Sequence, residues 1–226
     1  MEIRFLGHAC FELTEGDTRV LVDPFLTGNP KAAASADEVE PTHILLTHGH
    51  ADHYGDIEAI AKRTGAQVVA IVEIANELGE AGVENVSDPN LGGTVKFDWG
   101  WVKLVPAWHT STTPKGQVNV PAGLLIGIGG KTVYHLGDTA LFSDLELIAR
   151  RGDPIDVALM CIGGHYTMDR IDAVTAAEFV GATTVIPCHY DTFPPIETDV
   201  QAFKSEVESQ TSSKVEVLEP GATFSP

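Results

Sequence analysis

The chain has 226 residues and carries 14 Lys and Arg against 32 Asp and Glu, a formal net charge of −18. This length allows one large domain with a substantial core, and 43% hydrophobic with 20% charged residues is a globular composition. Disorder, collagen-like structure and coiled coil are therefore excluded. The acidic charge repels phosphate backbones and disfavours nucleic acid as a partner.

Neither a membrane span nor a leader is visible in the sequence. No apolar run reaches the roughly 20 residues that cross a bilayer, and residues 1–6 begin directly as alternating, strand-like sequence. Three cysteines, Cys10, Cys161 and Cys188, are too few for a disulfide framework and indicate a reducing compartment. We expect a cytoplasmic protein without a membrane partner, either a monomer or a homo-oligomer.

Apolar runs and turn residues predict the elements in chain order. Strands are expected at 3–13, 19–23, 43–47 and 67–72, with helices at 57–63 and 73–81. A second block has strands at 94–97, 101–105, 124–128, 132–136, 157–162, 184–187 and 214–218, and helices at 143–150, 173–180 and 200–209. We expect one domain over 1–226, made of two halves with a seam near 87–93 and helices outside two packed sheets. The loop at 110–121 is either a mobile element near a site or a passive surface loop.

The segment 47–53, Thr-His-Gly-His-Ala-Asp-His, follows an apolar run and precedes a predicted helix. With nine histidines in the chain, its His-x-His-x-Asp-His pattern arises by chance about once in a thousand such sequences. His48 and His50 are two apart on an extended segment, so their imidazoles can bind one cation from the same side. Asp52 and His53 lie where the chain turns into a helix and can face a second cation.

Three more candidate ligands follow predicted strands. His109, Asp138 and His189 each come after a short apolar run, where the chain enters a loop. Sites in layered α/β folds gather at the carboxyl ends of strands, so these side chains can converge on one cleft with the 47–53 segment.

The whole pattern resembles the metallo-β-lactamase superfamily of metal-dependent hydrolases. The residues that carry the resemblance are, in the family's order, His48, His50, Asp52, His53, His109, the Gly137-Asp138-Thr139 segment and His189. The segments 6–11, 23–24 and 166–168 are similar to a branch of bacterial and archaeal hydrolases related to ascorbate-6-phosphate lactonase. The resemblance implies an α/β fold, an αβ/βα four-layer sandwich of two packed mixed β-sheets with helices on the outer faces.

The resemblance also implies a ligand set for two divalent ions. His48, His50 and His109 would bind one ion, Asp52, His53 and His189 the other, and Asp138 would bridge them. Imidazoles and carboxylates without a thiolate favour Zn²⁺ and also suit Mn²⁺, Fe²⁺ or Ni²⁺. Two ions roughly 3.5–4 Å apart would activate a bridging hydroxide for attack on a small ester, lactone or phosphodiester substrate, with Asp52 as the catalytic carboxylate that orients it or accepts its proton.

Three further residues are candidates for a second layer or for substrate contact. Asp23 resembles the superfamily carboxylate that accepts a hydrogen bond from a ligating histidine, or is a turn aspartate before proline. His8 faces the substrate or a ligand, or is structural. His165 stands where the branch has a polar, usually amide-bearing residue, and is a substrate contact, an acid or a loop histidine.

The sequence also bears on functions other than hydrolysis of a small molecule. A nuclease or RNA-processing phosphodiesterase of the same superfamily would need a basic surface, which the 14 basic residues do not indicate. An oxygen-reducing diiron protein tends to have Glu at the position of His50. A non-catalytic metal-binding protein that retains the fold stays open. A true β-lactamase is disfavoured, because no export signal is visible and Asp138 fills the bridging position.

Overall fold

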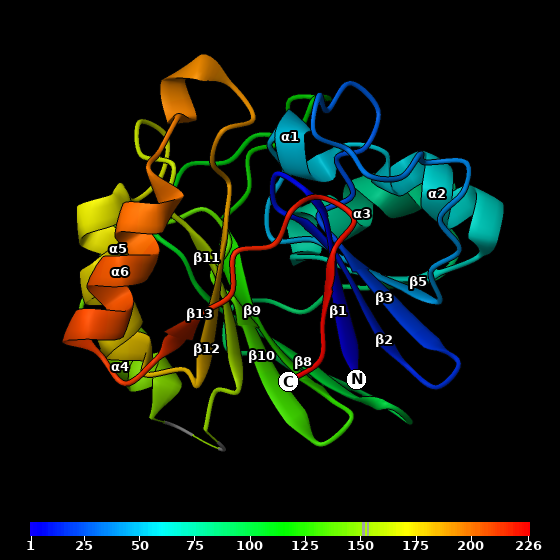
Figure 1. The fold of residues 1–226 in the computed structure, drawn as a ribbon. Helices are drawn as coiled ribbons and strands as arrows, with labels where there is room; N and C mark the ends of the chain where they lie inside the picture. The colour runs from blue at the N-terminus through cyan, green and yellow to red at the C-terminus, as the bar shows by residue number, and fades with distance from the viewer. Residues whose placement is uncertain (151, 153) are drawn as a thin grey trace.

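The computed structural model describes residues 1–150, 152 and 154–226, whose strands form two packed sheets (Figure 1). The first sheet has the order β14-β1-β2-β3-β4-β5-β6, with β1 (Glu2–Gly7), β2 (Cys10–Glu15), β3 (Thr18–Val22), β4 (His43–Leu45), β5 (Gln67–Val69), β6 (Val86–Ser87) and β14 (Thr223–Phe224). The second has the order β13-β12-β11-β10-β9-β8-β7, with β7 (Thr94–Phe97), β8 (Gly100–Pro106), β9 (Ala122–Ile128), β10 (Lys131–His135), β11 (Val157–Cys161), β12 (Thr184–Cys188) and β13 (Lys214–Val215).

Helices cover the outer face of each sheet. The described helices are α1 (Ala51–Tyr54), α2 (Ile57–Thr64), α3 (Val72–Glu80), α4 (Asp144–Ala149), α5 (Arg170–Val180) and α6 (Val200–Gln210), with a 3₁₀ turn η1 (Pro194–Ile196). In Figure 1, α4, α5 and α6 lie outside the second sheet, and α2 and α3 lie outside the first. The predicted αβ/βα four-layer sandwich is therefore confirmed. Among the described residues, no helix is both long and apolar enough to cross a membrane.

The core lies mainly between the two sheets. Phe11 and Leu21 from the first sheet and Leu124 and Ile126 from the second are fully buried members of one continuous apolar cluster. A second cluster, which includes Phe203 of α6, joins the second sheet to its helices. Burial of apolar surface on both faces of each sheet holds the four layers together.

Both sheets change from antiparallel to parallel pairing. The pairs β1–β2 and β2–β3 are antiparallel, whereas β3–β4, β4–β5 and β5–β6 are parallel. In the second sheet β7 to β10 are antiparallel, and β10 to β13 are parallel. The carboxyl ends of the parallel strands lie at one edge of the sandwich, which is where sites form in layered α/β folds.

The predicted elements differ from the observed ones mainly at their ends. The chain crosses from the first sheet to the second within residues 88–93 and returns to the first sheet through β14. The description of the chain as one domain made of two halves stays a prediction. The short pieces β6, β14 and α1 were not predicted, because two to four residues are too short to show a period. Helix α5 starts three residues earlier than expected because the Asp169 side chain caps it, accepting from the backbone N–H of Ile171 and Asp172 at 2.9 Å.

One histidine just before the 47–53 motif links the two sheets. Trp99, between β7 and β8, donates its indole N–H to His43 Nε2 at 3.0 Å, and Thr42 Oγ1 lies 2.9 Å from His43 Nδ1. Nε2 can accept this bond only while the ring is neutral, and burial lowers the pKa of His43 below its usual 6.5.

We expect His43 to make folding sensitive to acid. Because its folded-state pKa is depressed, the unfolded chain binds a proton first, and the free energy of unfolding falls as the pH drops below the unfolded value of 6.5. Urea unfolding at about pH 7.5 and about pH 5.5 should show a smaller loss in His43→Gln than in the unmodified protein. An equal loss in both proteins would contradict this role.

Candidate metal centre

Each candidate site residue follows the carboxyl end of a strand. The chain brings six segments to one edge of the sandwich: His8 after β1, Asp23 after β3, residues 47–53 after β4, His109 after β8, Asp138 after β10 and His189 after β12. The seven predicted ligands therefore meet at the edge where the sheets change to parallel pairing. Asp52 and His53 lie in the single turn of α1 that follows the extended segment with His48 and His50.

The backbone at this edge is unusually constrained. Among the described residues, five that are not glycine have a positive φ, and His8 (61°), Asp23 (47°) and His189 (54°) are three of them. Such angles cost energy and persist where surrounding structure holds them, often at functional sites. Gly137, just before Asp138, has φ +67°, and a Cβ there would lie 2.6 Å from the carbonyl oxygen of Ala122. Glycine is therefore required to turn the chain into Asp138.

Two groups of side chains place ligand atoms close enough to hold a metal ion. In each group the candidate atoms all lie within 4.8 Å of one another. Group one is His48, His50, His109 and Asp138. Group two is His8, Asp52, His53 and His189. Apart from His8, these are the residues proposed as ligands from the sequence, but Asp138, which was expected to be shared, falls in group one, and His8 joins group two.

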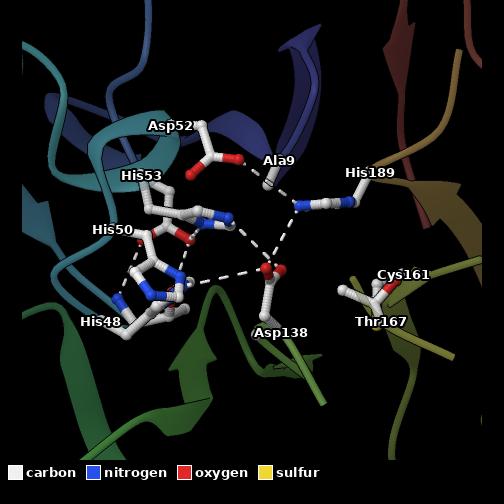
Figure 2. A network of polar contacts seen from close by, with 12 residues as sticks. Ala9, His48, His50, Asp52, His53, Asp138, Cys161, Thr167 and His189 are labelled. Carbon is white, nitrogen blue, oxygen red and sulfur yellow. Dashed lines mark hydrogen bonds and ion pairs between the residues drawn. The ribbon is translucent and has the colours of Figure 1, made fainter. Parts of the chain in front are cut away.

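Asp138 lies between the two groups (Figure 2). Its Oδ2 is 3.1 Å from His189 Nε2 and 3.5 Å from His109 Nε2, and its Oδ1 is 3.3 Å from His53 Nε2. Burial alone would raise the pKa of Asp138, but the positive charges of His189 and His53 hold it well below its usual value. The carboxylate is thus ionised, buried and in contact with ligand candidates of both groups.

Asp23 orients imidazoles in both groups. Its Oδ2 accepts from His53 Nδ1 at 2.8 Å and from Thr47 Oγ1 at 2.7 Å, and its Oδ1 accepts from the backbone N–H of Thr47 at 2.8 Å. Because the Thr47 hydroxyl donates to Asp23, it accepts from His48 Nδ1 at 3.0 Å. Both rings therefore carry a proton on Nδ1, and Nε2 is the nitrogen that faces the site.

Several buried polar atoms at this place lack a partner. In the described part of the chain, His53 Nε2, His189 Nε2 and Asp138 Oδ1 make no properly directed hydrogen bond although they are fully buried. Buried polar atoms are almost always satisfied, so such a gathering needs an explanation. Nitrogen and carboxylate lone pairs that point toward one another are the donor set of a divalent transition metal, and these residues fit one.

His8 is held between Thr192 and Asp52. Its Nε2 is 3.1 Å from Asp52 Oδ2, and its Nδ1 is 2.8 Å from Thr192 Oγ1. A carboxylate only accepts, so His8 Nε2 donates to Asp52 and Nδ1 accepts from Thr192. Burial lowers the pKa of His8 to about 4, against the opposing hydrogen bond to Asp52. Although burial would raise the pKa of Asp52, the His8 hydrogen bond and the charge of His53 hold it below its usual value. Sequence reasoning missed Thr47 and Thr192, since single threonines in loops carry no pattern.

A cavity of about 530 Å³ opens onto the two groups. Group residues and loop side chains line it: Phe25, His50, Ala51, Asp52, His109, Thr110, Asp138, Tyr166 and Phe193. His165 is not among these lining residues, and its ring instead contacts Tyr166 edge-to-face at 4.5 Å. The three cysteines are buried free thiols, and burial raises the pKa of each above its ordinary value. The cavity was not foreseen, because its aromatic walls come from separate loops.

Comparison with known proteins identifies the family. Residues 2–189, which include both groups, match the family described as "Beta-lactamase superfamily domain". A UPF0173 metal-dependent hydrolase of Thermus thermophilus is 49% identical over 204 residues, covering 90% of this chain and 89% of its own, and one of Shouchella clausii is 47% identical over 230 residues, covering 99% of both. The solved structure of Igni18, a metallo hydrolase from Ignicoccus hospitalis, superposes with a TM-score of 0.89 at 36% identity, covering 99% of this chain and 98% of that one. The protein accordingly belongs to the UPF0173 metal-dependent hydrolases of the β-lactamase superfamily.

Proposed function

We propose that the protein is a dinuclear metal-dependent hydrolase of a small ester, lactone or phosphodiester. His48, His50 and His109 would bind one divalent ion, and Asp52, His53 and His189 would bind the other. The observation that carries the proposal is the place of Asp138, whose two carboxylate oxygens approach histidines of both groups within 3.5 Å. Zn²⁺ is our first expectation from this donor set, with Mn²⁺, Fe²⁺ and Ni²⁺ as alternatives.

Each of the protein's own groups would have a separate role in the reaction. Bound ions would supply a Lewis acid for the scissile carbonyl or phosphoryl oxygen and lower the pKa of the attacking water. Asp52 lines the cavity as an ionised carboxylate, so it can orient that water and accept its proton. His8 donates to Asp52 and keeps one of its oxygens fixed, while Asp23 keeps the lone pairs of His48 and His53 directed inward.

The donor set predicts the metal content of the protein. Purified protein should bind close to two transition-metal ions per chain, as in dinuclear hydrolases. His109→Ala should lose at least one of them, because its Nε2 belongs to group one. His165→Ala is the matched control, since His165 is exposed and lies in neither group. Elemental analysis that finds metal-free, folded protein after metal loading would overturn the dinuclear site.

Hydrolysis itself is tested by substrate screening. The metal-loaded protein is assayed with 4-nitrophenyl carboxylic esters, lactones and bis(4-nitrophenyl) phosphate, before and after chelation. We expect turnover of at least one class that chelation abolishes and added metal restores. Loaded protein that turns over none of them would favour the alternative of a non-catalytic metal-binding protein. The cytoplasmic location and the oligomeric state stay predictions from the sequence.

A further inference from the structure

The walls of the cavity are aromatic, whereas its floor is the candidate metal centre. Phe25 follows Asp23, Tyr166 follows β11, and Phe193 follows His189 and β12, so three separate loops each supply one ring. The rings of Phe25 and Phe193 lie 6.4 Å apart, centroid to centroid. They contact the ring of His8 at 5.7 Å and 5.6 Å, respectively, which fixes them beside the centre.

The described lining of the cavity offers no lysine or arginine to bind the part of a substrate that does not react. Among the described residues that line it, Thr110 and Tyr166 supply its neutral side-chain hydroxyls. Proteins bind a phosphate or carboxylate group through Arg, Lys or several backbone N–H groups. A negative charge on the distal part of a substrate, held away from the metal ions, would instead face aromatic rings, whose faces carry negative potential.

The volume of about 530 Å³ is that of an ordinary small-molecule pocket, larger than an acetyl or methyl group needs. Phe25 and Phe193 are half-buried, and Tyr166 is 54% exposed, so their rings are available to a ligand at the mouth. Burying an alkyl chain or an aryl ring against them removes apolar surface of both partners from water. This contact would retain the substrate while its scissile group lies on the floor.

We infer that the substrate is an uncharged carboxylic ester or lactone whose non-reacting part is an alkyl chain or an aryl ring. This inference rests on the proposed function and names the substrate class of that same site. Hydrolysis adds water across the acyl C–O bond: the acyl carbon gains the hydroxyl, the leaving oxygen gains the proton, and no oxidant or reductant is needed. Sugar phosphates and nucleotides are thereby excluded as substrates, because their distal charge has no partner in the cavity.

The experiment compares two substrates that differ in one distal charge. 4-Nitrophenyl hexanoate and the mono-4-nitrophenyl ester of adipic acid have the same leaving group and chain, but the second ends in a carboxylate. For the metal-loaded protein we expect kcat/KM at least about tenfold higher for the neutral ester, mainly through KM. Equal or higher kcat/KM for the anionic ester would overturn the inference.

Variants at the mouth of the cavity test separately the contribution of the aromatic wall to binding and the effect of adding a cation. Tyr166→Ala should raise KM for the neutral ester about threefold or more, whereas Tyr166→Phe, which keeps the ring, should raise KM less than Tyr166→Ala does. Thr110→Lys adds a cation at an exposed lining position and should reduce the preference for the neutral ester, and Thr110→Ala should not. A preference that none of these variants alters would place the discrimination elsewhere and contradict the inference.

A binding measurement keeps the inference testable if no ester is hydrolysed. N-Phenylhexanamide and its analogue with a carboxylate at the chain end are poor substrates, and their binding to loaded protein is measured by ligand-observed NMR. Tighter binding of the neutral amide, lost in Tyr166→Ala, supports the inference even when hydrolysis, and with it the proposed function, fails. Tighter binding of the anionic amide overturns the inference whatever the activity.

Discussion

Replacing Asp52 with asparagine is expected to lower turnover by about 10²-fold or more while the protein stays folded. The substitution keeps the size of the side chain but removes the negative charge that, in the proposed mechanism, orients the water and accepts its proton. It also turns the acceptor of the His8 hydrogen bond into a neutral amide. Steady-state kinetics on a substrate found by screening, together with metal content and a melting curve, measures the effect.

A second aspartate provides the control for this prediction. Asp17 is exposed in the turn between β2 and β3, so Asp17→Asn makes the same chemical change away from the site. It should leave turnover unchanged. If Asp52→Asn retained near-normal turnover with full metal content, Asp52 would be removed from the reaction and kept at most as a ligand.

Removing the metal ions is expected to lower the melting temperature by roughly 10 °C. An ion that binds only the folded chain stabilises it by RT ln(1 + [M]/Kd), about 4 kcal/mol at a thousandfold excess over Kd. For a chain of this length, 1 kcal/mol corresponds to about 2–4 °C. Melting curves before chelation, after confirmed metal loss and after reloading give the shift. Matching curves would show that the site is not coupled to folding.

Asp138 should account for part of this stabilisation. Without metal ions, Asp138 and Asp52 repel each other, yet the structure places histidines beside them that can carry compensating charge. Burial opposes protonation of His53, but the charges of Asp138 and Asp23 hold its pKa well above the usual value. The metal-free fold is therefore supported by imidazolium–carboxylate contacts. If Asp138 is the shared ligand, Asp138→Asn removes it, so the melting temperatures of the loaded and chelated protein should differ less than in the unmodified protein.

The sequence determined the layered class and the ligand candidates. Each long element has a period that its own residues display: α2 and α6 lie within one residue of their predicted bounds, and the buried strands β9 to β12 are apolar runs between turn residues. The ligand candidates were predictable for a similar reason. Four of them lie within six residues, and His109, Asp138 and His189 stand at strand ends, where one-dimensional position already indicates the edge of a sheet.

Tertiary structure alone decided which distant side chains meet. His8 and Thr192 are 184 residues apart and hydrogen-bonded, and no local pattern marks either as a partner of the other. The same holds for the cavity, where Phe25, Tyr166 and Phe193 become neighbours only because β3, β11 and β12 end at one edge. An isolated phenylalanine in a loop looks like any other apolar residue in the sequence. Its role follows from packing between loops, which depends on the complete arrangement of both sheets.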